Sequence, residues 1–193
     1  MPKHTRKPHP PSETWAKHIL DLVHSDVCGP FPIHTLHGKL YFIIFLHNYT
    51  HLVNVQLLAS KDQALKAWKI IKPLWENHAE RKVKTFRSDN SRKFINLAFR
   101  HFLHDTGISH ELSSSYSHQQ NGKAECALRT LQGRTLAMLQ LAKLPTSLWG
   151  EAVLTATYLW NHTESVSLPP GVTPFELVNG RKPDISHLHV FGS

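Results

Sequence analysis

The sequence lacks the features that mark membrane, secreted and disulfide-rich proteins. Its longest uninterrupted apolar run, Leu40 to Leu46, has seven residues, whereas a membrane-spanning helix needs about 20. The start Met1-Pro2-Lys3-His4 has no apolar region of the signal-peptide kind. The only cysteines, Cys28 and Cys126, are too few for a disulfide framework and too far apart for a CxxC metal-binding pair. The sequence therefore predicts a protein that stays inside the cell and has no membrane partner.

Acidic residues are also scarce. There are 14 Asp and Glu against 22 Lys and Arg, which gives a formal net charge of +8 and a pI near 9.6. A balance this basic favours a polyanionic partner, most often nucleic acid, although a merely soluble basic protein is the simpler alternative. Sixteen histidines add positive charge below about pH 6.5. We therefore expect any affinity for a polyanion to strengthen on acidification.

Hydrophobic periodicity predicts a mixed α/β domain. Apolar runs predict strands over residues 19–26, 41–47, 51–58, 83–88 and 108–112, and the short turn at Asn48 makes the second and third antiparallel. Apolar residues at helical spacing predict helices over residues 61–78, 94–105, 123–142 and 147–161. We expect the first helix to kink or break at Pro73. The tail from Pro169 is interpreted as loop-rich.

Three carboxylates stand where an α/β fold places its sites. Asp26 and Asp89 each end a predicted strand, and Glu125 opens a helix after the polar loop 113–122. Taken singly, an aspartate at a strand end is a turn or cap residue and a glutamate in a first helical turn complements the helix dipole. Brought together, the three would repel unless cations neutralised them, which is the signature of a Mg²⁺ or Mn²⁺ site.

From about residue 20 to the end, the sequence around these carboxylates resembles the integrase catalytic core of copia-type LTR retrotransposons. The interval between Asp89 and Glu125 is 125 − 89 − 1 = 35 residues, which matches the D,D-35-E pattern of that family. The stretches that carry the resemblance are Leu22-Val23-His24-Ser25-Asp26-Val27-Cys28-Gly29-Pro30, Phe86-Arg87-Ser88-Asp89-Asn90, His118-Gln119-Gln120-Asn121-Gly122-Lys123-Ala124-Glu125, Leu148-Trp149-Gly150-Glu151-Ala152 and His187-Leu188-His189-Val190-Phe191-Gly192.

The resemblance implies a fold, a domain division and a metal site. The fold is ribonuclease-H-like, with a mixed five-stranded sheet flanked by helices. We expect a basic, proline-rich flank over residues 1–18, the catalytic core over residues 19–165, and a truncated C-terminal extension over residues 166–193. Asp26, Asp89 and Glu125 are the implied catalytic residues, and they hold the divalent Mg²⁺ or Mn²⁺.

The resemblance also implies a reaction. Water trims the 3′ ends of the element's DNA, and the exposed 3′-hydroxyls then attack target DNA. DNA is the expected partner, with RNA as a second candidate, and the chain is expected to act in the nucleus as a homo-oligomer on DNA after cytoplasmic synthesis. One alternative is a nucleic-acid-binding remnant without catalysis. Another is a nuclease of RNA–DNA hybrids, against which the 35-residue interval and the Gln-Gln-Asn-Gly motif argue.

Several polar residues near the carboxylates are candidates for contact with nucleic acid. Amide side chains can reach phosphates or base edges, and a basic side chain one turn from Glu125 can touch a phosphate near the metals. Each has an ordinary alternative: a plain surface loop for the amides, solvated charge for Lys123, and an ion pair with Glu125 for Arg129. The candidates are Asn90, Gln119, Gln120, Asn121, Lys123 and Arg129.

Both cysteines stand close in sequence to the carboxylates. Cys28 lies two residues after Asp26 on the same strand face, and Cys126 directly follows Glu125. Both thiols could therefore lie beside the site. The interpretation we favour is that both are small buried hydrophobic residues.

Overall fold

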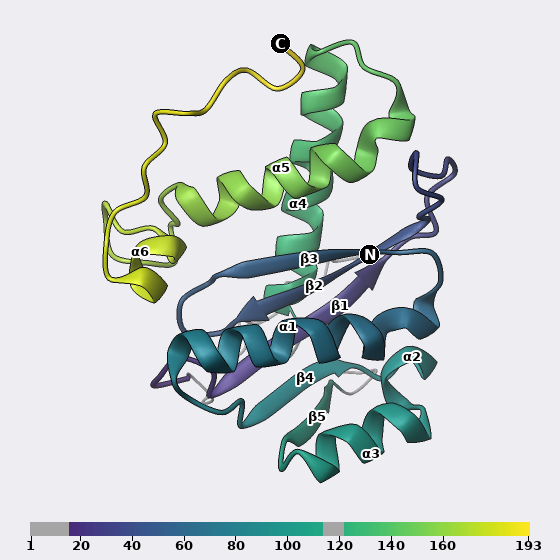
Figure 1. Ribbon diagram of the computed structural model, residues 1–193, viewed down its shortest axis with the longest axis vertical. Coiled ribbons are helices and arrows are strands. Elements are labelled where there is room, and N and C mark those ends of the chain that lie inside the picture. Colours follow the sequence, from purple (N-terminus) through teal and green to yellow (C-terminus); the bar gives the residue numbers. More distant parts are fainter. Residues whose placement is uncertain (1–15, 114–121) are drawn as a thin grey trace, which may run out of the picture.

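The computed structural model describes residues 16–113 and 122–193, which form a five-stranded mixed sheet flanked by helices (Figure 1). The strand order is β3-β2-β1-β4-β5. β1 pairs antiparallel with β2 and β2 with β3, whereas β4 runs parallel to both β1 and β5. The predicted sheet is confirmed. Its strands are β1 (Leu22–Cys28), β2 (Tyr41–His47), β3 (Val53–Leu58), β4 (Thr85–Asp89) and β5 (Ser109–Ser113).

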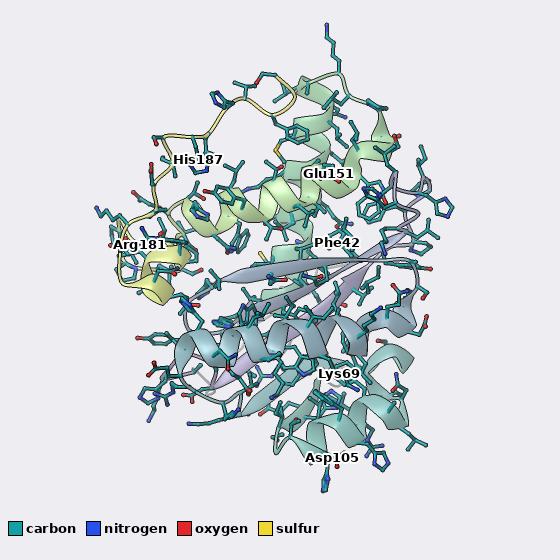
Figure 2. All side chains as sticks on the ribbon, viewed as in Figure 1. Phe42, Lys69, Asp105, Glu151, Arg181 and His187 are labelled. Atoms are coloured by element: carbon teal, nitrogen blue, oxygen red, sulfur yellow. The ribbon has the colours of Figure 1, made fainter. Side chains whose placement is uncertain are left out.

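Helices cover both faces of this sheet. Figure 1 shows α1 and α3 on one side of the sheet and α4 on the other, where α5 crosses α4. Residues 180–193 leave α6 and return along α5, where Tyr158 Oη lies 2.9 Å from Nε2 of His187 (Figure 2). The helices are α1 (Ala64–Ala79), α2 (Arg92–Ile95), α3 (Leu97–Asp105), α4 (Gly122–Leu141), α5 (Trp149–His162) and α6 (Pro174–Asn179), with 3₁₀ turns η1 (Lys61–Gln63) and η3 (Thr146–Leu148).

Strand alternation divides the apolar residues into two cores. Under α1 and α3, Phe86 packs against Trp68 and Phe99 with ring centroids 4.8 and 5.3 Å apart. Under α4 and α5, Phe42 packs with Leu131 and Trp149. Because β1 and β2 contribute residues to both cores, their side chains are buried on both faces. This explains why these strands are nearly continuous apolar runs in the sequence.

β1 ends at Cys28, directly before Gly29. The glycine has φ of +118°, and a Cβ there would lie 2.6 Å from the carbonyl oxygen of Leu40. Only glycine therefore allows the chain to leave β1 so close to the start of β2. This exit fixes the carboxyl end of β1, just beyond Asp26.

Three local expectations need correction. α1 is not broken at Pro73 but runs on to Ala79, where Trp75 packs with Phe45 beyond the proline. The predicted helix over residues 94–105 is divided at Asn96, whose side chain accepts the backbone N–H of Phe99 and so begins α3. The tail from Pro169 is loop-rich as expected, but it also contains the short helix α6. Within the part of the chain that the structure describes, no helix is both long and apolar enough to cross a membrane.

Candidate active site

Asp26 and Asp89 lie side by side at the carboxyl ends of two adjacent parallel strands. The last paired residues of β1 and β4 are Ser25 and Ser88, and each aspartate is the next residue along its strand. Neighbouring strands are about 4.8 Å apart. The sheet itself therefore brings together two carboxylates that are 63 residues apart in sequence (89 − 26), as the strand-end argument predicts.

Both aspartates project toward the face of the sheet that α4 covers. Val27 and Phe86 belong to the core under α1, so the alternating residues of the same strands point to the opposite side. Cys28 confirms this direction for β1, because it packs against the core under α4.

Glu125 reaches the same face from α4. Nε2 of Gln132 donates to Sγ of Cys28 at 2.8 Å, which turns that face of α4 toward β1. Glu125 lies seven residues before Gln132, nearly two full turns, and therefore shares its face. At its start, α4 is held where Nζ of Lys123 donates to the carbonyl oxygen of Asn48 at 3.4 Å. Along α4, Glu125 thus lies between the contact of Lys123 with Asn48 and the contact of Gln132 with Cys28.

Hydrogen bonds orient the two aspartates. The backbone N–H of Val27 donates to Oδ1 of Asp26 at 2.7 Å. The hydroxyl of Ser91 donates to Oδ1 of Asp89 at 2.8 Å. Each aspartate therefore has one oxygen held by its own strand end or by the turn that follows.

Arg87 is a charged residue beside the site that is not among the candidates predicted from the sequence, and it forms an ion pair with Glu111. Its Nε donates to Oε2 of Glu111 on β5 at 2.8 Å, and Arg87 is buried. Burial and the Arg87 charge together lower the pKa of Lys123. Strand alternation could have found Arg87, because it lies two residues before Asp89 and so projects from the same face.

The donor set suits a hard divalent cation, since carboxylate oxygens are the ligands that Mg²⁺ prefers. The arrangement brings two of the three carboxylates next to each other and the third onto the same face. Among residues 16–113 and 122–193, however, no group of three or more His, Cys, Asp or Glu side chains lies close enough together to hold a metal ion. The three carboxylates are the right type of ligand for a divalent metal, but they do not lie close enough together to form one metal-binding group.

The candidates for nucleic-acid contact fall into three groups. Asn90 and Arg129 are exposed. Among the described residues, Arg129 forms no ion pair with Glu125. Lys123 is half-buried against Asn48. Gln119, Gln120 and Asn121 lie outside the described residues.

The two cysteines differ from the expectation that both are buried. Cys28 is half-buried under Gln132, but Cys126 is exposed. The reason is the helical period: Cys126 lies 200° around α4 from Ala124, which faces the core, so it turns away from the core.

Comparisons with known proteins agree on one family. The Integrase core domain family matches residues 17–118, a range that contains Asp26 and Asp89 and ends before Glu125. The retrovirus-related Pol polyprotein from transposon TNT 1-94 of Nicotiana tabacum is 40% identical over 174 residues, covering 90% of this chain and 13% of that protein. The Pol polyprotein from transposon RE2 of Arabidopsis thaliana is 31% identical over 173 residues, covering 90% and 12%. The chain thus spans about an eighth of these relatives.

Solved structures show the fold. A simian T-cell lymphotropic virus intasome in complex with PP2A regulatory subunit B56 gamma contains a chain with a TM-score of 0.66 at 14% identity, covering 88% of this chain and 59% of that one. The HTLV-2 integrase catalytic core domain in complex with magnesium, in a trimeric form, has a TM-score of 0.60 at 14% identity, covering 82% and 96%. The ribonuclease-H-like fold is therefore confirmed.

Proposed function

The chain belongs to the integrase core domain family, in the copia-type retrotransposon group, and from this we propose that it is the polynucleotidyl transferase core that processes element DNA 3′ ends and joins them to target DNA. The observation that carries the proposal is the side-by-side placement of Asp26 and Asp89 at two parallel strand ends, on the face that α4 covers with Glu125. Two carboxylates so placed need a cationic partner.

Asp26, Asp89 and Glu125 are the residues that would hold Mg²⁺ or Mn²⁺. When bound, such an ion polarises a phosphodiester and activates the attacking hydroxyl. The chain contributes the orientation: Val27 holds one oxygen of Asp26 and Ser91 one oxygen of Asp89. A small approach of α4 toward β1 would complete the set, which is the change that we expect DNA and metal to produce.

DNA is the proposed partner, and Asn90, Lys123 and Arg129 are its proposed contacts among the described residues. The net charge of +8 supports a polyanionic partner. The structural neighbours, an intasome and a trimeric catalytic core, support assembly into a homo-oligomer on DNA. Action in the nucleus, after synthesis in the cytoplasm, follows from the proposed reaction with target DNA.

A second candidate function is DNA binding without catalysis. It is favoured by one observation, namely that no group of three metal-ligating side chains is gathered among the described residues. The catalytic candidate predicts DNA products that form only when the metal is present. The binding candidate predicts no products, and an affinity for DNA that depends on salt concentration.

The experiment that separates them is reversal of strand transfer on a branched DNA substrate with Mn²⁺. An isolated core needs the least help from other domains for this step. We expect product from the chain and loss of product from Asp89→Asn, with Asp105→Asn as the matched control, because Asp105 is exposed at the far end of α3 (Figure 2). No product from a folded, DNA-binding chain would favour the non-catalytic candidate.

A further inference from the structure

A cavity of about 290 Å³ lies on the other side of α4 from the carboxylates. Its walls come from α4, from the end of α5, from the segment that follows α5, and from His51 before β3. We name it the Arg134 cavity, lined among others by Lys123, Thr130, Arg134, Trp160 and Glu164.

The helical period separates this cavity from the active site. Arg134 lies nine residues after Glu125, which is 900° of rotation and therefore half a turn away around α4. Thr130 lies 140° from Glu125 by the same count. A ligand in the cavity would thus contact α4 without touching the carboxylates.

Positive groups dominate the walls. The guanidinium carbon of Arg134 lies 5.7 Å from the ring centre of Trp160, and Arg134 is exposed and forms no ion pair with a described residue. Lys123 is half-buried at the opposite wall. Glu164 is the one acidic side chain of the described lining, and it is exposed at the rim.

Nearby positive charge also acts on two titratable groups of the cavity wall, second to burial. Burial, and then the charge of Lys123, lower the pKa of His51 to about 4, so this wall residue is neutral at pH 7. Burial and the Arg87 charge lower the pKa of Lys123 itself. An anion bound in the cavity would relieve this repulsion.

The remaining lining suits the oxygens and the sugar of a nucleic-acid backbone. Thr130, Ser165 and Ser167 bring hydroxyl groups to the cavity, and hydroxyls donate to phosphate oxygens. Apolar contact comes from Leu46 and Trp160. Hydroxyl donors and cations together with apolar side chains suit a phosphate with its attached sugar.

We propose that the Arg134 cavity binds a backbone phosphate of nucleic acid, on the side of α4 opposite to the catalytic carboxylates. The proposal rests on the proposed function for the source of that phosphate, which is DNA. One helix would then contact DNA on two sides, through Glu125 and its neighbours on one and through Arg134 on the other.

The first test measures duplex DNA binding by fluorescence anisotropy over a range of salt concentrations. We expect Arg134→Ala to weaken binding by about tenfold and to reduce the salt slope by about one unit, as loss of one phosphate contact does. Arg134→Lys should keep most of the affinity. Glu164→Gln should tighten binding about twofold, because it removes the one acidic group of the described lining. Lys66→Ala, an exposed lysine of α1, is the matched control. Affinities of Arg134→Ala and Glu164→Gln equal to that of the unchanged chain would overturn the proposal.

The second test uses Cys126, which is exposed and lines the cavity. Alkylation of Cys126 by iodoacetamide is followed by peptide mass spectrometry, with duplex DNA or inorganic phosphate present at matched ionic strength. We expect DNA to slow the alkylation in the unchanged chain at least about fivefold, and less in Arg134→Ala. Protection by inorganic phosphate alone would assign a free anion to the cavity and refute the nucleic-acid source. Unchanged alkylation in both arms would refute the site.

Failure of this proposal is distinguishable from failure of the proposed function. Asp89→Asn should lose metal-dependent strand transfer and keep DNA protection of Cys126, because Asp89 lies on the sheet and not in the cavity lining. A chain that shows protection without strand transfer would retain the cavity as a phosphate site and refute only the catalytic function.

Discussion

Single residues decide how firmly the site is held, and the clearest case lies beneath it in α1. Glu76 is buried and accepts hydrogen bonds from Lys72 Nζ at 2.8 Å, Lys82 Nζ at 3.3 Å and the backbone N–H of Val83 at 2.9 Å. Val83 leads directly into β4, which carries Asp89. One carboxylate thus fixes both the end of α1 and the start of the strand that positions an active-site residue.

We predict that Glu76→Gln destabilises the chain by about 1 to 3 kcal/mol, because it leaves the half-buried Lys72 with a weaker partner. Burial raises the pKa of Glu76, but the hydrogen bonds from Lys72, Val83 and Lys82 outweigh burial and lower it below its ordinary 4.5. The contribution is therefore present above pH 4.5 and is lost as the pH falls through the lowered pKa.

Urea unfolding at pH 7 and at pH 3.5 measures this difference. The stability gap between the unchanged chain and Glu76→Gln should narrow at the lower pH, whereas Glu151→Gln, at an exposed position of α5 (Figure 2), should show no gap at either pH. A gap that widens on acidification would contradict the assignment.

His47, like Glu76, makes the fold less stable as the pH falls, but it acts in a higher pH range. It is buried beside Trp75, with ring centroids 4.0 Å apart, and burial lowers its pKa to about 3. The unfolded chain takes up a proton on this residue below about pH 6.5, whereas the folded chain does not. Stability is therefore highest above pH 6.5 and falls as the pH decreases toward 3.

We predict that protonation of His47 in the unfolded chain lowers the free energy of unfolding by about 2 kcal/mol when the pH falls from 7.5 to 5. His47→Phe keeps an aromatic ring beside Trp75 and removes the titration, so its stability should change less over this range. Thermal unfolding at the two pH values measures both chains, with His78→Asn as an exposed control on α1. Equal losses for the unchanged chain and His47→Phe would show that another group carries the effect.

At the scale of elements, α1 carries a proline that its packing overrides. Pro73 lies in the tenth position of this 16-residue helix, where it removes one backbone hydrogen bond. The helix continues because Trp75 packs with Phe45 and Glu76 is held by its ion pairs.

We predict that Pro73→Ala stabilises the chain by about 1 kcal/mol, since alanine restores the backbone donor at an exposed position and the contacts beyond it do not change. The measurement is the thermal midpoint, which should rise by about 2 to 4 °C. Lys66→Ala in the same helix should leave the midpoint within about 1 °C. A lower midpoint for Pro73→Ala would mean that α1 depends on the bend that proline imposes.

Elements whose signals are local and periodic were predictable, and elements that depend on short capping signals were overlooked. β2 was predicted over its observed range because Tyr41 to His47 is an apolar run that the sheet buries on both faces. α6 was missed although its signals are present: Thr173 caps its first turn, Pro174 begins it and Gly180 ends it. Its six residues bury too little for hydrophobic periodicity to mark it.

The same distinction applies to the site. The strand ends predicted that Asp26 and Asp89 would share one edge, because the pairing of parallel strands is a property of the sheet. The approach of Glu125 depends on contacts between elements distant in sequence, such as Gln132 with Cys28. Strand alternation places Arg87 on the same face as Asp89, but its partner Glu111 is brought to it only by the pairing of β4 with β5.

At the scale of the whole molecule, histidines link charge to stability. Burial lowers the pKa of His47, His51 and His110, with Lys123 adding to the effect at His51 and Arg100 at His110. His47 and His51 therefore add no charge when the solution is mildly acidified. The full chain has 16 histidines, and histidine is the side chain that gains positive charge on mild acidification. Acidification should therefore raise the net charge above +8 while it weakens the fold through His47 and His51.

We predict that lowering the pH from 7.5 to 6.0 at constant ionic strength tightens duplex DNA binding by about threefold or more and steepens its salt slope, because more phosphates are neutralised. The thermal midpoint should fall over the same range, since the unfolded chain binds more protons at His47 and His51 than the folded chain does. Fluorescence anisotropy and thermal unfolding on the same samples measure the two trends. His51→Gln should retain the tightening, because His51 is neutral throughout this range, and should lose part of the drop in midpoint. Weaker binding at pH 6.0 by a chain that is still folded would show that general charge does not control the affinity for DNA.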